Sequence, residues 1–232
     1  MRPTIAALIT LPLFALPAHA ATRSVPVQGF SKIRVEGPFT VKVRTGQSVS
    51  VKASGPETRL DKLIVENRGG TLLVTNEKGW SWRGLSWGRD DEVLIEISVP
   101  MIEAAELAGS GELAVDRVRT GNFSALVTGS GNLSVARLDA TRLKGTVTGS
   151  GDLSLTGKTS QAELSLTGSG DLLASALTVN QLNASLLGSG DLKVGKTLTA
   201  RARLMGSGDI VIAGRPKCTI SKMGSGEVRC GG

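Results

Sequence analysis

The chain has 232 residues, of which 40% are hydrophobic and 20% charged, so it is long enough for one globular domain with its own core and is not intrinsically disordered. Aromatic residues make up only 3%, Tyr is absent and Gly occurs 30 times, so Leu, Val, Ile and Ala must build the core between frequent turns. The formal charge of +7 favours anionic partners such as acidic glycans, lipopolysaccharide or anionic lipid headgroups, unless it serves only to keep the protein soluble.

Residues 1–20 are predicted to be a secretory signal peptide that is cleaved after Ala20. A short basic start precedes the apolar stretch TIAALITLPLFALP, which is short and proline-containing for a membrane span. Ala18, His19 and Ala20 then form the small-x-small pattern of a cleavage site. An N-terminal membrane anchor is the alternative. We therefore expect a periplasmic or secreted protein that does not span the membrane. Nucleic acid is not an expected partner in that compartment.

Cleavage would remove His19, which is the only histidine of the chain. A chain without His lacks the usual group for proton transfer near neutral pH, and it lacks Ser-His-Asp catalysis, Cys-His catalysis and His-ligated zinc. We predict no cofactor and no catalytic residue.

Short strands are predicted through the first half of the mature chain. The stretch SKIRVEGPFTVKVRTGQSVSVKASG alternates apolar and polar residues, LIVENRGGTLLVTNEKG reads as two strands around a Gly-Gly turn, and DEVLIEISVP is a strand ended by Pro100. No amphipathic helix of useful length is apparent. We expect one domain over 21–232, with irregular coils over 21–108 and regular repeats over 109–232.

Residues 79–91, GWSWRGLSWGRDD, form a predicted loop that contains all three tryptophans. Trp stacks on sugar rings and Arg binds anionic groups, so this loop is the candidate ligand-binding site. The alternative is that its tryptophans pack against the body of the domain. The candidate residues are Trp80, Trp82, Arg83, Trp87 and Arg89.

The second half repeats a Gly-Ser-Gly unit seven times at spacings of 18 to 20 residues. An apolar residue stands two positions before each unit except the last, and others stand four and six positions before most of them, with mostly polar residues between. This period of two predicts a strand that enters each unit with one face buried. The units begin at Gly109, Gly129, Gly149, Gly168, Gly188, Gly206 and Gly224.

A unit of about 20 residues cannot bury its own apolar face, whereas stacked units can. The sequence therefore predicts an all-β fold, a single right-handed parallel β-helix, with equivalent residues about 4.8 Å apart in neighbouring coils. A β-propeller is the structural rival, but its blades run to about 40–45 residues. In a β-helix the Gly-Ser-Gly units become corners, because Gly adopts the positive φ that tight corners need.

An acid or amide follows every corner, and stacking would align these side chains in a row. Like charges about 5 Å apart repel, so the row needs a compensating interaction. Three are open: hydrogen bonds from backbone N–H groups at the same turn, bridging cations such as Ca²⁺, or screening by nearby Lys and Arg. The same carboxylates carry the only enzyme hypothesis, a polysaccharide-cleaving activity, but nothing distinguishes one pair from the rest. The aspartates of the row are Asp152, Asp171, Asp191 and Asp209.

Cys218 and Cys230 are the only cysteines, so in a secreted chain we predict a disulfide between them. The bridge would hold the last coil, which has no neighbour beyond it, and would stabilise the fold by roughly 3 kcal/mol.

The opening RSVPVQGFSKIRVEGPFTVKVRTGQ, the GGTLLVTNE hairpin, VLIEISVP and the GSGDL ladder together resemble the head GIN domain family of autotransporter adhesins. The resemblance covers nearly all of the mature chain and implies a bacterial secreted or envelope protein with a parallel β-helix. The sequence departs from the family label in showing no C-terminal β-barrel pattern, so we expect a protein that is free in the periplasm or outside the cell and is not a self-exporting autotransporter. We expect a non-catalytic binding or scaffold protein for anionic glycans or lipopolysaccharide, with a homo-oligomer left open. A polysaccharide-active enzyme and a calcium-stabilised rod are the alternatives.

Overall fold

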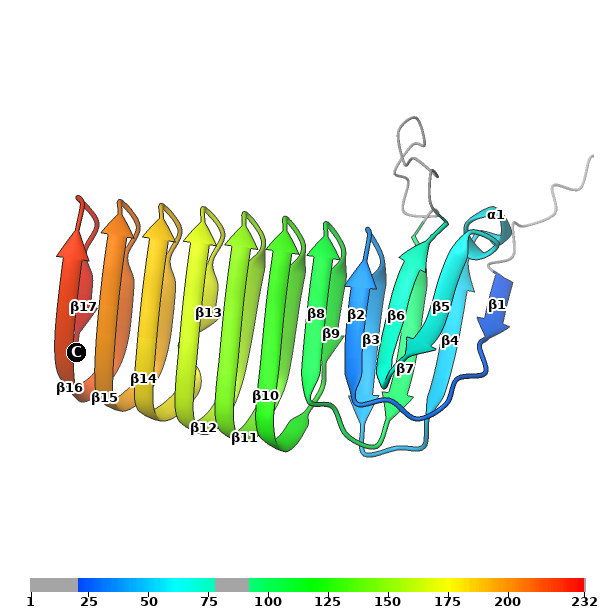
Figure 1. The fold of residues 1–232 in the computed structure, drawn as a ribbon, viewed down its shortest axis with the longest axis horizontal. Coiled ribbons are helices and arrows are strands. Elements are labelled where there is room, and N and C mark those ends of the chain that lie inside the picture. Colours follow the sequence, from blue (N-terminus) through cyan, green and yellow to red (C-terminus); the bar gives the residue numbers. More distant parts are fainter. Residues whose placement is uncertain (1–20, 78–91, 232) are drawn as a thin grey trace, which may run out of the picture.

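A computed structural model describes residues 21–77 and 92–231 of the chain. Its 17 strands belong to one continuous sheet that winds into a parallel β-solenoid, drawn as a rod in Figure 1. The all-β fold and the stacking of the repeats are confirmed. The one helix of the described residues, α1 (Glu57–Leu60), is a single turn at the N-terminal end of the rod.

The N-terminal half contains short strands: β1 (Ala21–Ser24), β2 (Lys32–Glu36), β3 (Thr40–Thr45), β4 (Ser50–Gly55), β5 (Leu63–Arg68), β6 (Thr71–Asn76), β7 (Leu94–Val99), β8 (Ala104–Gly109) and β9 (Glu112–Val115). The C-terminal half contains mostly longer strands, four of which (β11, β12, β15 and β16) run from one corner to the next: β10 (Val118–Gly129), β11 (Asn132–Gly149), β12 (Asp152–Gly168), β13 (Leu172–Ala174), β14 (Leu177–Gly188), β15 (Leu192–Gly206), β16 (Ile210–Met223) and β17 (Val228–Cys230).

The coil made by β2 and β3 comes first in the sequence but not in space. β2 pairs in parallel with both β6 and β8, and β3 pairs in parallel with both β7 and β9. This coil is therefore inserted between the coil of β6 and β7 and the coil of β8 and β9, as Figure 1 shows. The alternation of apolar residues predicted the strands but not this order. The pattern is alike in all coils, so it does not specify which coils are neighbours.

Gly37, Pro38 and Phe39 form an additional corner in line with the Gly-Ser-Gly units. The N–H of Gly37 donates to the carbonyl of Ala108 at 2.9 Å, and the N–H of Glu112 donates to the carbonyl of Phe39 at 2.8 Å. The inserted coil is thereby joined to the regular repeats.

The core is a set of aliphatic columns along the rod axis. The residues two positions before the corners are in register from coil to coil and are at most 1% exposed: Leu107, Val127, Val147, Leu166, Leu186 and Leu204. The expected alternation is wrong only in the last coil, where Lys222 continues this column and is exposed, and where Ile220 is 47% exposed. These residues lie at the end of the stack, so within the described chain no further coil covers them.

The two glycines of each corner are required for different reasons. Gly188 has φ = +137°, and its carbonyl accepts N–H groups from Ser207 at 2.9 Å and Gly208 at 3.2 Å. Gly190 has no positive φ, but a Cβ there would lie 1.8 Å from the carbonyl oxygen of Gly170 in the preceding coil. The corners therefore stack so closely that no side chain fits at the second glycine.

The two ends of the rod differ. At the N-terminal end, β1 pairs antiparallel with β4, and β4 pairs antiparallel with β7, so the parallel winding stops there. Leu60 of α1 is buried against this end. At the C-terminal end, the 217–223 part of β16 pairs with β15 on one side, and no other described strand covers its second edge.

Substituting the second glycine of one corner tests this packing. Gly190→Ala should lower the free energy of unfolding by more than about 2 kcal/mol, because the methyl group would overlap a backbone carbonyl that cannot move without separating two coils. Urea denaturation followed by circular dichroism measures the change. The control is Ser189→Ala, an exposed position in the same corner, which should change stability by less than about 0.5 kcal/mol. Equal stability of both variants would contradict the proposed packing.

Candidate ligand-binding site

The tryptophan loop predicted as a ligand site lies outside the described residues. Trp80, Trp82, Arg83, Trp87 and Arg89 all fall within 78–91. Their role stays a prediction, and the candidate surfaces below are built from the rest of the chain.

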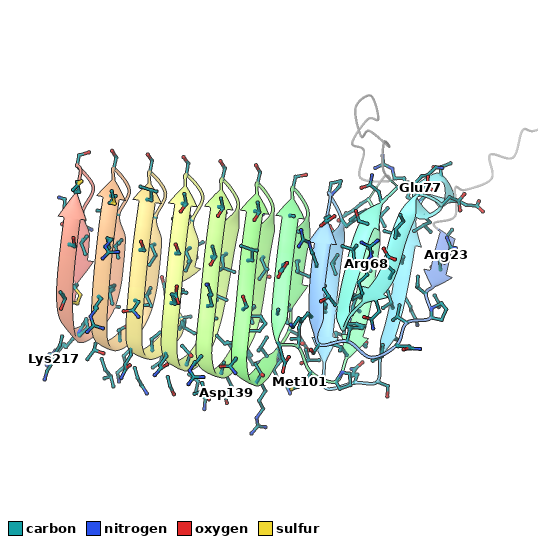
Figure 2. All side chains as sticks on the ribbon, in the orientation of Figure 1. Arg23, Arg68, Glu77, Met101, Asp139 and Lys217 are labelled. Atoms are coloured by element: carbon teal, nitrogen blue, oxygen red, sulfur yellow. A yellow bond between two sulfur atoms is a disulfide. The ribbon has the colours of Figure 1, made fainter. Side chains whose placement is uncertain are left out.

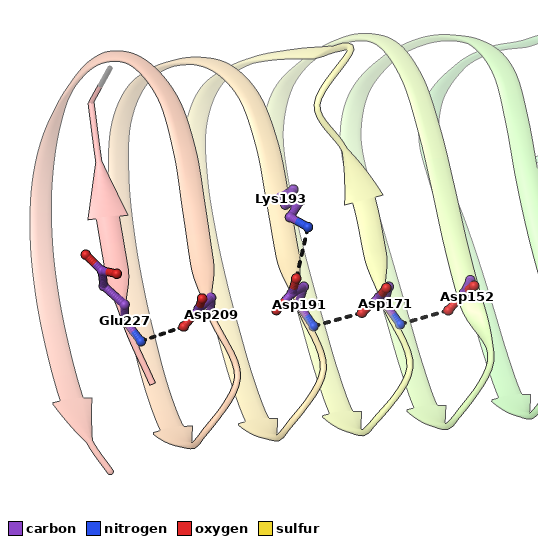
Figure 3. Close-up of polar contacts among 6 residues, drawn as sticks. All are labelled: Asp152, Asp171, Asp191, Lys193, Asp209 and Glu227. Atoms are coloured by element: carbon purple, nitrogen blue, oxygen red, sulfur yellow. Dashed lines mark hydrogen bonds and ion pairs between the residues drawn. The ribbon is translucent and has the colours of Figure 1, made fainter. Parts of the chain in front are cut away.

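The aspartate row exists, and it is bonded between coils. Oδ1 of Asp152 accepts the N–H of Asp171 at 2.9 Å, and Oδ1 of Asp171 accepts the N–H of Asp191 at 2.9 Å. Oδ1 of Asp209 accepts the N–H of Glu227 at 2.8 Å, as Figure 3 shows. Each of these carboxylates thus bonds the next coil. Of the three compensating interactions left open, backbone N–H donation is the one observed for these aspartates, but the donor belongs to the following coil and not to the same turn, because the parallel stacking brings that N–H near.

Lys193 neutralises part of the row. Its ammonium group is 2.9 Å from Oδ2 of Asp191, two residues earlier. This hydrogen bond, supported by the attraction between the charges, lowers the pKa of Asp191, while partial burial opposes the shift. The same bond raises the pKa of Lys193. Within residues 21–77 and 92–231, no three His, Cys, Asp or Glu residues cluster closely enough to hold a metal ion. The row is explained as a structural element that bonds neighbouring coils.

Substitution of Asp171 separates the hydrogen-bonding explanation from the calcium alternative. Asp171→Ala should lower the free energy of unfolding by about 1–2 kcal/mol, because the N–H of Asp191 loses its acceptor. Asp171→Asn should lower it less, since the amide oxygen can accept the same bond and Asn132 occupies this row in an earlier coil. Thermal unfolding with and without EDTA is the measurement. A lower melting temperature on chelation would instead support a cation-stabilised rod.

The ion pair predicts a pH dependence of stability. Because the folded-state pKa of Asp191 is lowered, its contribution is complete above the ordinary aspartate pKa and is lost as the pH falls through the lowered value. Asp191→Asn should therefore be less stable than the wild type near neutral pH, by less than about 1 kcal/mol for such an exposed pair, and should match it in acid. Melting temperatures measured across the acidic range give the comparison. A difference that stays constant into strong acid would contradict this origin.

The predicted disulfide between Cys218 and Cys230 is present, with 6.6 Å between the Cα atoms. Cys218 pairs in register with Ala200 and Cys230 with Ile212, both of which are core positions. The bridge joins the two strand segments of the last coil and packs against the core. No other cysteine is present.

A polar groove runs along one outward face of the solenoid, over strands β8, β10 to β12 and β14 to β16. It consists of three overlapping depressions of about 700, 520 and 370 Å³, which share Asn183 and are joined by Glu163 and Arg201. Most of its polar side chains come from outward positions three, five and seven residues before the corners. In Figure 2 one of them, Lys217, lies in the last coil of the rod.

The groove changes character along its length. At its N-terminal end lie Glu103 and Glu106, and in the middle are the uncharged amides Gln161, Gln181 and Asn183. Cations predominate in the remainder, where Glu163 is a further acid. The groove cations are Lys32 at the N-terminal end and then Arg142, Lys144, Arg201, Arg203 and Lys217.

Most of these cations lack an internal partner. Arg142 donates to Oδ1 of Asn122 at 3.3 Å, whereas none of Lys144, Arg201, Arg203 and Lys217 forms an ion pair with any residue that the structure describes. All four are exposed. They are therefore available to an external anion.

Sequence reasoning did not single out this groove. Its residues are outward positions that looked like an ordinary solvated face, and they differ in type from coil to coil. The signal that could have found them is the register itself, because aligning the repeats by their corners places Arg142 and Lys144, and then Arg201 and Arg203, on one face.

Comparison with known proteins decides the family. A family model described as "Putative auto-transporter adhesin, head GIN domain" matches residues 29–216, most of the chain. The chain belongs to the head GIN domain family. The resemblance inferred from sequence motifs is thus confirmed. A search among curated proteins found no significant match.

Solved structures share the fold of this head GIN domain at low sequence identity. A putative adhesin from Bacteroides fragilis is 24% identical, with a TM-score of 0.82 over 91% of this chain and 96% of its own. A protein from Parabacteroides distasonis, described as a putative lipid binding protein, is 20% identical, with a TM-score of 0.73 over 92% and 97%. A putative adhesin from Parabacteroides merdae is 16% identical, with a TM-score of 0.69 over 92% and 96%. In the described part of this head GIN domain, no helix has the length and apolar character needed to cross a membrane.

Proposed function

We propose that this head GIN domain is a non-catalytic, periplasmic or secreted protein of the cell envelope that binds anionic glycans in its polar groove. The observation that carries the proposal is the set of exposed cations without internal ion pairs, Lys144, Arg201, Arg203 and Lys217, along a groove that also presents amides.

The chemistry of the groove matches a charged sugar polymer. Arg201 and Arg203 are two residues apart on β15, so both side chains leave the same face from Cα atoms about 7 Å apart. A guanidinium binds carboxylate, phosphate or sulfate through two parallel hydrogen bonds. Gln161, Gln181 and Asn183 offer donors and acceptors for sugar hydroxyls, at a spacing of about 4.8 Å between coils. A long, open groove with a repeating period suits a polymer more than a compact ligand.

Three further observations support this location and role. The disulfide fits an oxidising compartment. The matching family is described in terms of adhesins, and two of the similar structures are described as putative adhesins. Three carboxylates of the acidic row, Asp152, Asp171 and Asp209, accept hydrogen bonds that join the coils, which supports a structural use for them.

Removal of two groove cations tests the proposal. Arg201→Ser together with Arg203→Ser should weaken binding of dextran sulfate by about tenfold or more, because two charge-assisted contacts are lost. Serine suits these positions, since Ser124 and Ser185 occupy the same two outward rows in earlier coils. Affinity is measured by titration calorimetry, with uncharged dextran as the matched neutral ligand.

The control is Arg119→Ser with Arg137→Ser, which removes the same charge from exposed positions outside the groove. If both double variants bind dextran sulfate equally weakly, the loss is due to net charge alone and the groove is not the binding site. A variant with Trp80, Trp82 and Trp87 all changed to Ala tests the predicted loop separately. Loss of binding in that variant alone would assign the ligand to the loop instead.

A further inference from the structure

Three exposed apolar side chains form a column at the C-terminal end of the solenoid. Leu187, Met205 and Met223 are direct register partners in β14, β15 and β16, each one residue before its corner. They are 49%, 42% and 68% exposed. With coils about 4.8 Å apart, the column is about 10 Å long.

The same row is polar in the three coils that precede Leu187. The register partners that precede Leu187 are Thr167, Thr148 and Thr128. Threonine at this position is therefore compatible with the stacking of regular coils. The change to Leu and Met is confined to the last three coils, so folding alone does not explain it.

The column ends in the most cationic part of the rod. The last coil, 213–231, contains Arg215, Lys217, Lys222 and Arg229 against one acid, Glu227, which pairs with Arg229. Ile220 of the same coil is also exposed at the open end. In the preceding coil, Arg203 stands two residues before Met205 and leaves the same outward face. Apolar and cationic groups are thus presented side by side.

Two occupants could cover such a patch, and charge distinguishes them. A second copy of the chain could pair with the open edge of β16. In a symmetric contact between two C-terminal ends, however, each copy would bring four cations and one carboxylate, and the like charges would repel. An anionic lipid surface accepts both components, because its headgroups pair with Lys and Arg while its interface takes up Leu, Met and Ile.

We propose that this C-terminal patch docks the head GIN domain onto an anionic lipid surface. Leu187, Met205 and Met223 enter the interfacial layer, and Arg203, Lys217 and Lys222 contact the headgroup phosphates. Both components are needed, since stable attachment to a membrane generally takes an apolar and an electrostatic contribution together. This inference goes beyond glycan binding, because it depends on the apolar column Leu187, Met205 and Met223, which lies outside the groove residues, although Arg203 and Lys217 serve both proposals.

The experiment measures cosedimentation of the exported protein, whose N-terminus is verified by mass spectrometry so that the apolar segment 1–20 does not contribute. One set of vesicles contains phosphatidylcholine alone, and the other contains phosphatidylcholine and phosphatidylglycerol in equal parts. The test variant is Leu187→Thr, Met205→Thr and Met223→Thr, which extends the threonine row of the earlier coils and should preserve the fold. The control is Leu198→Thr, an apolar side chain 57% exposed elsewhere on the rod.

We expect the wild type and the Leu198→Thr control to bind the phosphatidylglycerol vesicles and the triple variant to bind about tenfold more weakly. Binding to phosphatidylcholine alone should be weak, and added salt should reduce the attachment to anionic vesicles. Dextran sulfate binding by the triple variant should be unchanged, which separates this inference from the glycan proposal.

Either of two results would overturn the inference: absence of binding to phosphatidylglycerol vesicles, or equal binding by the triple variant and the wild type. Light scattering provides the remaining check. A dimer that dissociates in the triple variant would assign the patch to a second copy of the chain.

Discussion

The close contact between successive corners is the constraint on which the rest of the solenoid depends. At each corner the carbonyl of one glycine accepts bonds from the next coil, and the second glycine leaves no room for a Cβ. This contact fixes both the spacing and the rotation of one coil on the next. Because the corners are in register, every other row along the rod is also in register, and buried columns, aspartates and groove side chains align without further specification.

The aspartates show how this register turns an unfavourable arrangement into a favourable one. Carboxylates aligned at the spacing of a parallel sheet would repel one another in isolation. Here an oxygen of Asp152, Asp171 or Asp209 accepts a hydrogen bond from a backbone N–H of the neighbouring coil. This charge-assisted bond stabilises the carboxylate and joins the two coils. Lys193 offsets part of what remains at Asp191. The acidic row is therefore part of the scaffold, whereas the glycan site that we propose lies on a face where the residue type changes from coil to coil.

The repeated part of the fold could be predicted from the sequence because its signals are local and agree with one another. The period-two alternation before each corner gave the buried columns, and the two cysteines gave the disulfide. The order of the N-terminal coils could not be predicted, since β2 would pair equally well with several strands of similar pattern. The groove was missed because its cations lie in separate coils and become neighbours only after stacking. The predicted tryptophan site falls in 78–91, outside the described residues.

The interleaved position of β2 and β3 has a consequence for how such rods change in length. Both neighbours of that coil come later in the chain, so an extra coil inserted before residue 115 would have to break an existing pairing on each side. Beyond Val118 every described coil except the last lies between its immediate predecessor and successor, and duplication of one 18- to 20-residue unit there would add a coil that repeats the same contacts. The regular repeats are thus the part of the rod whose length can change by one unit without altering the order of the other coils, whereas the interleaved N-terminal coils depend on one another.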